Sequence, residues 1–228
     1  MRICFVVILS FVLSSCVGKK VEIPIFSYDT HVNSIIIVQS SVGHGTGFYV
    51  GNGLFLTAKH VVENSEVTYY AITKKAEDKK INLEVVYRSP DIDLAVLKIK
   101  DENHGLTPLK LADDNAKIGD LVHMISNPVN YKLLSFSYSY GYVMKDGFID
   151  KEPPYLGQHF LCQIARYFGS SGAPVFNTNG EVVGMLNMLI LNSSIGCGLT
   201  IEAIRKDLVA KGFLKIENTL LKSNLVIN

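Results

Sequence analysis

The sequence predicts an all-β domain, either a barrel or a sandwich, that is followed by a single helix. Twelve short runs rich in Val, Ile, Leu, Phe and Tyr lie between residues 35 and 201, separated by polar, Gly or Pro residues. Such runs between turn residues are typical of antiparallel strands. Helical spacing is confined to Ile201–Phe213, where Ala203, Ile204, Leu208 and Val209 recur on one face.

Six of the runs lie in the first half of the chain. They cover Ile35–Val38, Thr46–Val50, Leu54–Ala58, Val67–Ile72, Leu83–Arg88 and Leu94–Ile99. The segment Gly51-Asn52-Gly53 between the second and third runs predicts a hairpin. After a linker expected at residues 112–117, the other six runs cover Leu121–Ser126, Phe136–Val143, His159–Ala165, Ala173–Phe176, Val182–Ile190 and Gly198–Ile201.

Composition places the chain among ordinary globular proteins. Its 228 residues allow one large domain or two small ones, and 48% are hydrophobic and 19% charged. The net charge of +1 gives no electrostatic case for nucleic-acid binding, and the densest basic segment, residues 74–80, is interrupted by Glu77 and Asp78. No group of His, Cys, Asp and Glu has metal-ligand spacing, so we expect neither a metal nor another cofactor.

The N-terminus has the pattern of an export signal. Arg2 is followed by the apolar run Ile3–Leu13, which is too short to span a bilayer but suits a signal-peptide core. The run ends in Ser14-Ser15-Cys16, which resembles the lipidation site of bacterial lipoproteins. We therefore predict a signal peptide ending at Cys16, a lipid anchor on that cysteine and a tether over residues 17–30. The predicted location is the bacterial cell envelope; the alternative is an ordinary secretory signal and a secreted or periplasmic protein.

Three motifs together indicate acyl-transfer chemistry. Ser171 stands in Gly169-Ser170-Ser171-Gly172-Ala173-Pro174, and a serine between glycines can present its hydroxyl while the loop N–H groups converge on one point. Alone, this motif favours an ordinary hairpin turn. However, His60 closes an apolar run and Asp93 opens another, and the order His, Asp, Ser is one of the known orders for a catalytic triad.

At these residues the sequence resembles the trypsin/chymotrypsin-like serine peptidases, and most closely their bacterial Deg and glutamyl endopeptidase branch. The similarity runs from about Ile35 to Ile201 and includes Gly43–Phe48 and Gly119–Val122 with Asn127-Pro128. It implies two six-stranded antiparallel β-barrels, over about residues 31–112 and 117–201. A helix over about residues 201–213 and a tail over 215–228 would complete the chain, without the PDZ domain of Deg proteases.

The resemblance also implies the role of each site residue. Ser171 would be the nucleophile, His60 the general base and Asp93 the group that orients the imidazole, while the N–H groups of Gly169 and Ser171 would form the oxyanion hole. Asp91 is a rival to Asp93, because residues two apart on a strand point the same way. The family places its aspartate directly before Leu-Ala-Val-Leu, which favours Asp93.

The family pattern gives two further expectations. The specificity pocket would include Ala165, Asn187 and Gly198, and because Ala165 supplies no carboxylate, a preference for Lys or Arg is not expected. Cys162 and Cys197 would lie on neighbouring strands and could form a disulfide; the alternative is two buried thiols on different faces.

The remaining positions of interest have simpler interpretations. Ser170 and Ala173 stand where the family commonly has Asn or Asp and Gly, although relatives tolerate small residues at both positions. His44 is interpreted as a loop residue. The other histidines are interpreted as structural or surface residues; they are His31, His104, His123 and His159.

The sequence thus predicts a lipid-anchored serine endopeptidase that acts on proteins or peptides, with no nucleic-acid partner and its oligomeric state left open. Two alternatives use the same fold. One is a catalytically silent binding protein, and the other is a peptidase that stays latent until a partner orders the Ser171 loop.

Overall fold

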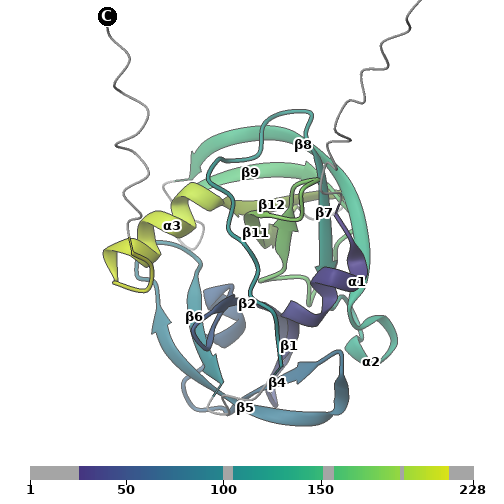
Figure 1. Ribbon diagram of the computed structural model, residues 1–228, viewed down its shortest axis with the longest axis vertical. Helices are drawn as coiled ribbons and strands as arrows, with labels where there is room; N and C mark the ends of the chain where they lie inside the picture. Colours follow the sequence, from purple (N-terminus) through teal and green to yellow (C-terminus); the bar gives the residue numbers. More distant parts are fainter. Residues whose placement is uncertain (1–25, 100–104, 151–156, 191–192, 216–228) are drawn as a thin grey trace, which may run out of the picture.

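The computed structural model describes residues 26–99, 105–150, 157–190 and 193–215. Each half of the chain forms a closed antiparallel barrel of six strands (Figure 1). This confirms the predicted fold class. Among the described residues, no helix is long and apolar enough to cross a membrane.

The first barrel has the strand order β1-β2-β3-β6-β5-β4. Its strands are β1 (Ile35–Gln39), β2 (His44–Gly51), β3 (Leu54–Thr57), β4 (Tyr69–Thr73), β5 (Ala76–Arg88) and β6 (Ala95–Ile99). The uninterrupted apolar run of β1 has a physical reason: Ile36 and Val38 pack inside this barrel, whereas Ile35 and Ile37 belong to a core shared with the second barrel. Both faces of the strand are therefore buried.

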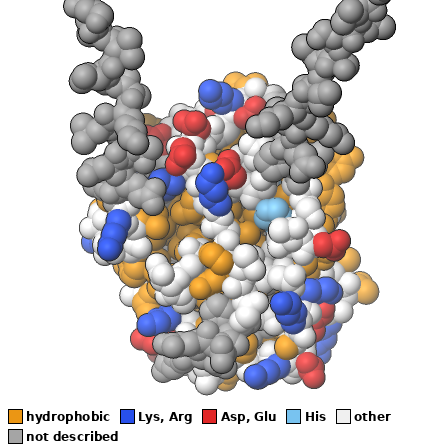
Figure 2. Space-filling model, viewed as in Figure 1, with side chains coloured by type: hydrophobic (Ala, Val, Ile, Leu, Met, Phe, Trp, Pro, Cys, Tyr) orange, Lys and Arg blue, Asp and Glu red, His pale blue; other side chains and the backbone are white. Residues whose placement is uncertain are grey.

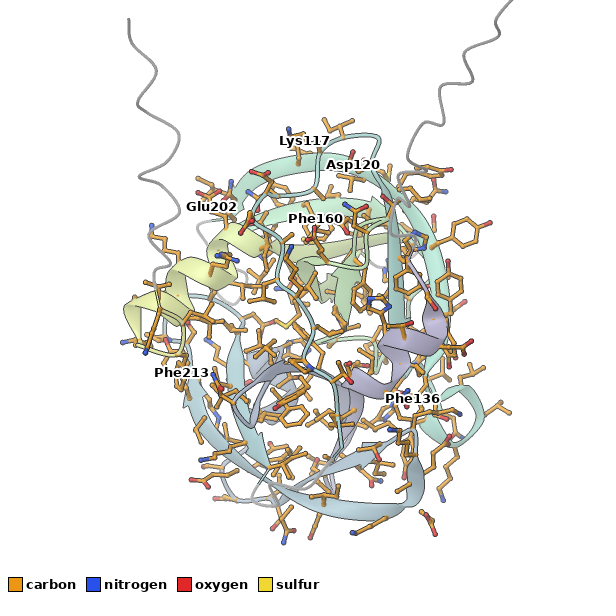
Figure 3. The ribbon with its side chains drawn as sticks, in the orientation of Figure 1. Lys117, Asp120, Phe136, Phe160, Glu202 and Phe213 are labelled. Carbon is orange, nitrogen blue, oxygen red and sulfur yellow. The ribbon has the colours of Figure 1, made fainter. Side chains whose placement is uncertain are left out.

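The second barrel has the order β10-β11-β12-β9-β8-β7. Its strands are β7 (Leu121–Ser126), β8 (Ser137–Asp150), β9 (Gly157–Gln163), β10 (Pro174–Phe176), β11 (Val182–Leu189) and β12 (Ile195–Thr200). The ring of Phe160 lies at the centre of this barrel (Figure 3). Glycines make room for it, since a Cβ atom would lie 2.5 Å from the ring at Gly184 and 2.8 Å from it at Gly198.

The predicted C-terminal helix, α3 (Ile201–Ala210), packs on the core shared by the two barrels. Thr200 caps it by accepting a hydrogen bond from Ala203 N, at 3.3 Å, and Ile204 and Leu208 are buried. The helix ends three residues earlier than expected. Gly212 follows the end with φ +76°, a conformation that favours glycine.

The N-terminal segment differs from the prediction. Residues 26–30 were expected in the tether, but they are part of the packed domain and lead into α1 (Tyr28–His31) and the 3₁₀ turn η1 (Val32–Ser34). The ring of Phe26 stacks on His123 at 4.5 Å, and Tyr28 OH donates to Phe136 O at 2.8 Å. These contacts remove residues 26–30 from the predicted tether.

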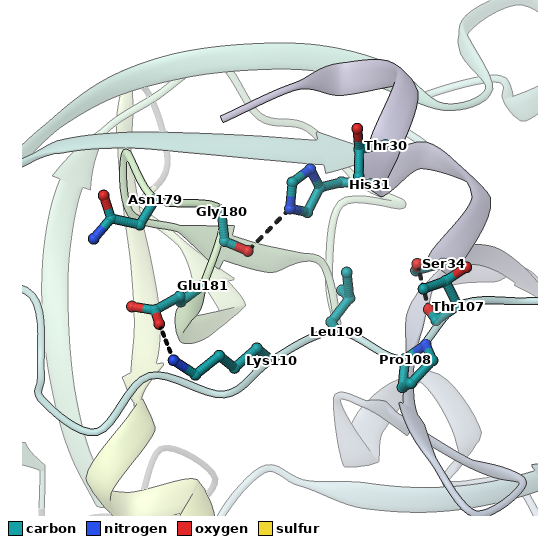
Figure 4. A pocket seen from close by; sticks show the side chains of 10 residues that line it. All are labelled: Thr30, His31, Ser34, Thr107, Pro108, Leu109, Lys110, Asn179, Gly180 and Glu181. Carbon is teal, nitrogen blue, oxygen red and sulfur yellow. Dashed lines mark hydrogen bonds and ion pairs between the residues drawn. The ribbon is translucent and has the colours of Figure 1, made fainter. Parts of the chain in front are cut away.

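A cavity of about 410 Å³ lies behind this segment (Figure 4). There, His31 Nε2 is 3.0 Å from Gly180 O, and Lys110 pairs with Glu181 at 2.5 Å. None of the residues predicted to carry out chemistry lines this cavity. Figure 2 shows Lys and Arg side chains interspersed with Asp and Glu on the same face of the molecule.

Candidate active site

His60 and Asp93 are held together in the first barrel. His60 lies on the 3₁₀ turn η2 (Lys59–Val62), which follows β3 directly, and Asp93 lies just before β6. His60 Nδ1 is 2.7 Å from Asp93 Oδ2, and the backbone N–H of His60 donates to Asp93 Oδ1 at 3.0 Å. Both carboxylate oxygens are therefore engaged. Because Nδ1 faces a carboxylate, it carries the ring proton and leaves Nε2 as an acceptor.

The two partners differ in their exposure to solvent. The Asp93 side chain is 6% exposed and that of His60 is 43% exposed. Asp91, the rival at sequence level, is exposed, and its backbone N–H donates to Ser89 Oγ at 3.2 Å. Of the two aspartates, only Asp93 forms hydrogen bonds with His60.

Helix α3 braces the segment that carries Asp93. The buried Ser89 donates from Oγ to Asp207 Oδ1 at 2.8 Å, and Tyr87 OH donates to the same oxygen at 3.2 Å. Burial raises the pKa of Tyr87, so the phenol remains a donor. Asp207 Oδ2 is buried without a hydrogen-bond partner. Through these contacts a helix of the second half of the chain fixes a loop of the first barrel.

Ser171 lies on the loop between β9 and β10, and its neighbouring glycines are required by space. Gly169 and Gly172 have φ angles of +93° and +85°. A Cβ atom at Gly169 would lie 2.3 Å from Asn127 O, and one at Gly172 would lie 2.1 Å from Thr46 O. No side chain fits at either position without displacing backbone atoms.

The first barrel also clamps this loop. Thr46 N donates to Ser171 O at 2.9 Å, and Thr46 Oγ1 donates to Gly169 O at 2.8 Å. Asn127 N in turn donates to Thr46 Oγ1 at 3.0 Å. Ser170, which departs from the family pattern, is buried and accepts a hydrogen bond from Tyr167 N at 3.2 Å. We refer to the contacts of Thr46 with residues 169–171 as the interbarrel clamp.

The Ser171 loop and His60 are not joined directly. Within the described residues, no hydrogen bond connects Ser171 Oγ with His60, and no acceptor is bound to the N–H of Gly169 or of Ser171. Catalytic hydrogen bonds are often long before substrate binds.

The contacts do not gather the three predicted pocket residues around one cavity. Ala165 is exposed, whereas Asn187 is buried and its Nδ2 is 3.3 Å from His159 Nε2. The open side of Gly198 faces Phe160 inside the barrel. Asn187 Oδ1 is buried without a hydrogen-bond partner.

Two residues near the loop were not identified from the sequence. His44, interpreted as a loop residue, begins β2, and its Nε2 lies 2.9 Å from Asn127 O. Arg166 is 8% exposed and donates to the carbonyls of the β11–β12 connection, including Ile195 O from Nε at 2.9 Å and Ser193 O at 3.1 Å. Burial lowers the pKa of Arg166. No carboxylate among the described residues forms an ion pair with it.

The possible disulfide between Cys162 and Cys197 is not formed, and the alternative of two buried thiols on different faces is the one observed. Both residues are buried thiols, and strands β9 and β12 are neighbours as expected. However, Cys162 is paired with Gly196 and Cys197 with Leu161. Because side chains alternate along a strand, this offset of one residue places the two sulfurs on opposite faces of the sheet.

Two further sequence predictions concern lipidation and metal binding. Cys16, the predicted lipidation site, lies outside the described residues. No group of three or more His, Cys, Asp or Glu side chains in the described part of the chain could hold a metal ion.

Comparison with known proteins identifies the family to which this chain belongs. A model of the trypsin-like peptidase domain matches residues 45–185, more than half of the chain. The periplasmic serine endoprotease DegP of Salmonella typhimurium is 29% identical over 199 residues, which cover 81% of this chain and 40% of that protein. A probable periplasmic DegP-like endoprotease of Rickettsia prowazekii is 30% identical over 195 residues, covering 83% and 36%. The chain spans less than half the length of these relatives.

Solved structures extend the comparison to the fold. The inactive form of the Rv3671c protease, from M. tuberculosis, superposes with a TM-score of 0.68 at 25% identity and covers 81% of this chain and 91% of that one. The HtrA-type protease AlgW, solved with a tripeptide, gives a TM-score of 0.69 at 18% identity. It covers 82% of this chain and 65% of that one, and this likeness concerns the fold alone.

Proposed function

The chain belongs to the trypsin-like peptidase family, and from this premise we propose that it is a serine endopeptidase working through an acyl-enzyme. The observation that carries the proposal is the pairing of His60 with Asp93 through both carboxylate oxygens. The interbarrel clamp supports it further, because it ties the Ser171 loop to the barrel that holds this pair.

In the proposed reaction, Ser171 Oγ attacks the scissile carbonyl while His60 Nε2 accepts the hydroxyl proton. Asp93 holds the Nδ1–H tautomer and stabilises the imidazolium that forms. The N–H groups of Gly169 and Ser171 donate to the developing oxyanion. His60 then gives its proton to the leaving amine, and water, activated by the same imidazole, hydrolyses the acyl-enzyme.

The substrate class follows from the premise: proteins or peptides, with no cofactor in the chemistry. Ala165 stands where a carboxylate would bind Lys or Arg side chains, so we propose a non-tryptic preference. The neighbouring Arg166 is a cation, and its guanidinium donates to backbone carbonyls.

A second candidate is a latent or silent protease fold that serves as a binding protein. The observation in its favour is that Ser171 Oγ and His60 share no hydrogen bond in the structure. It is the weaker candidate, because such bonds commonly form only when substrate is bound.

Labelling of the purified mature chain with a fluorophosphonate separates these candidates. We expect covalent labelling of the unmodified chain and none of Ser171→Ala, together with hydrolysis of a denatured protein such as casein that drops by about 10⁶-fold in the variant. Labelling only after peptide is added would support latency. Absence of labelling under all conditions would refute the peptidase proposal.

We also propose that the protein is exported and anchored in the cell envelope through a lipid on Cys16. The sequence pattern at residues 13–16 and the periplasmic names of the relatives support this proposal. In cells fed radioactive palmitate, the full chain should be labelled and sediment with membranes. Cys16→Ser should lose the label; an unchanged label or membrane fraction would remove the lipoprotein proposal without touching the peptidase one.

A further inference from the structure

Arg166 is a buried cation at the start of the Ser171 loop. Its side chain is 8% exposed, and its stem lies over Gly196 of β12, where an added Cβ atom would be 3.6 Å from Arg166 Cδ. Arginine is rarely buried to this extent without a paired carboxylate. Among the described residues, however, no carboxylate forms an ion pair with this guanidinium. The loop therefore carries a positive charge that the described part of the chain does not neutralise.

Backbone carbonyls hold the guanidinium in one place but leave some of its donors unused. Nε donates to Ile195 O at 2.9 Å, and Nη2 donates to Ile190 O at 2.9 Å and to Ser193 O at 3.1 Å. A guanidinium has five N–H donors in a planar fork. Nη1, which carries two of them, has no hydrogen-bond partner in the part of the chain that the structure describes. These two donors are free to bind a carboxylate.

The electrostatics at Arg166 also favour an anion. Burial lowers the pKa of Arg166, because a charged guanidinium is less stable away from water. Two neighbouring groups act in the opposite direction, the Cys162 thiol and the Tyr167 phenol. Burial raises the pKa of Cys162 to about 12, so this thiol carries no negative charge at neutral pH. A bound carboxylate would supply the missing negative charge.

A tight turn keeps Arg166 close to Ser171. Ser170 N donates to Tyr167 O at 3.0 Å, and Tyr167 N donates to Ser170 Oγ at 3.2 Å. Residues 167–170 therefore form a β-turn, and Arg166 and Ser171 lie at its two ends. Because the ends of such a turn are near one another, the cation and the proposed nucleophile belong to one compact loop.

Strand β11 runs past both ends of this turn. On the Ser171 side, Gly172 N donates to Leu186 O of β11 at 2.7 Å. On the other side, Ile190 O, directly after β11, accepts a hydrogen bond from Arg166. The pocket residues predicted from the family lie one to three positions from Arg166 or from a carbonyl that it binds; they are Ala165, Asn187 and Gly198. The guanidinium thus lies where these three sequence segments meet.

We infer that Arg166 determines specificity for an acidic substrate: its guanidinium binds the carboxylate of a Glu or Asp side chain on the residue that supplies the scissile carbonyl. This inference rests on the proposed function, because it names the side chain that the same site accepts. An acidic side chain at that position pairs with the buried cation, whereas a neutral one leaves it unpaired and a basic one is repelled by it.

The test compares fluorogenic peptides that differ only at the residue before the scissile bond, with the full mature chain as the enzyme. Glu and Gln have nearly the same shape, so the ratio of their kcat/KM values isolates the effect of charge. A hydrogen bond to a charged group changes a rate or affinity by about 10–100-fold. We therefore expect the Glu peptide to be cleaved about 10–100 times faster than the Gln peptide, and an Asp peptide to be preferred over an Asn peptide in the same way.

Variants then assign the preference to Arg166. Arg166→Gln should bring both ratios to about 1, and Arg166→Lys, which keeps the charge without the planar fork, should keep them above 1. Arg205→Gln is the matched control, because Arg205 is 39% exposed and pairs with Asp113 at 3.6 Å; it should leave both ratios unchanged. The labelling rate with diisopropyl fluorophosphate reports the reactivity of Ser171 without any substrate side chain.

Several results would overturn the inference. A Glu-to-Gln ratio near 1 in the unmodified chain would do so, even if Arg166→Gln does not fold. An equal slowing of labelling and of every peptide in the Arg166 variants, with unchanged ratios, would show a merely structural role. Labelling of Ser171 without an acidic preference refutes this inference alone. If the unmodified chain is not labelled at all, the proposed function fails first, and the specificity fails with it.

Discussion

The two halves of the candidate site are assembled in different ways. In the first barrel, His60 and Asp93 are joined by a side chain to side chain contact of 2.7 Å. In the second barrel, Ser171 is placed by its backbone, whose carbonyl accepts a hydrogen bond from Thr46 N at 2.9 Å. The histidine half should therefore respond to changes in single functional groups, and the serine half to changes in space and backbone direction.

The largest expected effect tests the histidine half. Asp93→Asn should lower kcat/KM for a protein substrate by about 10⁴-fold, because an amide cannot hold the Nδ1–H tautomer or stabilise the imidazolium. Asp91→Asn is the matched control, since Asp91 is exposed and does not contact His60. Equal losses in the two variants would contradict the assignment of Asp93.

The next effect tests the space around the serine half. Gly172→Ala should lower the free energy of unfolding by about 3 kcal/mol or more, because the new Cβ atom would lie 2.1 Å from Thr46 O and the φ of +85° disfavours alanine. At Gly43 no neighbouring atom lies within 4 Å of an added Cβ atom, so Gly43→Ala should change the free energy of unfolding by less than about 0.5 kcal/mol. Urea unfolding measures both. A small loss for Gly172→Ala would mean that the backbone around Thr46 moves easily to make room for the new Cβ atom.

A smaller effect tests the clamp itself. Thr46→Val keeps the side-chain shape but removes the hydroxyl between Asn127 N and Gly169 O. We expect a loss of about 1–3 kcal/mol in the free energy of unfolding, because both partners are then buried without a hydrogen bond. We also expect slower labelling of Ser171. Thr30→Val, at an exposed position, is the control; similar losses in the two would argue against the clamp.

The smallest effect concerns the interior of the second barrel. Burial raises the pKa of Cys162 from 9.0 to about 12. The folded protein thus holds this proton more tightly than the unfolded chain does. The free energy of unfolding therefore keeps its full value below about pH 9 and falls as the pH rises toward 12. At pH 8, iodoacetamide should modify Cys162 only after unfolding, as mass spectrometry can show. Rapid modification in the folded state would mean that this barrel opens readily.

Local sequence was sufficient for the strands and for the positions of the three motifs. The short apolar runs and the turn segments between them predicted the barrel strands to within a few residues in most cases; β5 begins seven residues before the predicted Leu83 and β8 ends seven residues after the predicted Val143. The elements that were missed, such as α1 and α2 (Tyr131–Leu134), are four residues long, too short to show helical periodicity.

Contacts between segments that are far apart in the sequence could not be predicted from it. His44 was interpreted as a loop residue from its place among the glycines of residues 43–47, and its partner, Asn127, lies 83 positions away in the sequence. Arg166 was not singled out, since its carbonyl partners carry no sequence signal. For Cys162 and Cys197 the neighbouring strands were predicted correctly, but register decides which face a side chain occupies.

The clamp between Thr46 and Ser171 joins positions 125 residues apart, and this separation has a consequence for the newly made chain. Residues leave the ribosome in order, so the His60–Asp93 pair is synthesised well before the nucleophile loop that Thr46 must hold. Contacts of such long range form slowly, because the intervening chain must be ordered first. In a nascent chain His60 and Asp93 are therefore present before Ser171, and the proposed site is complete only after the second barrel has been synthesised and folded.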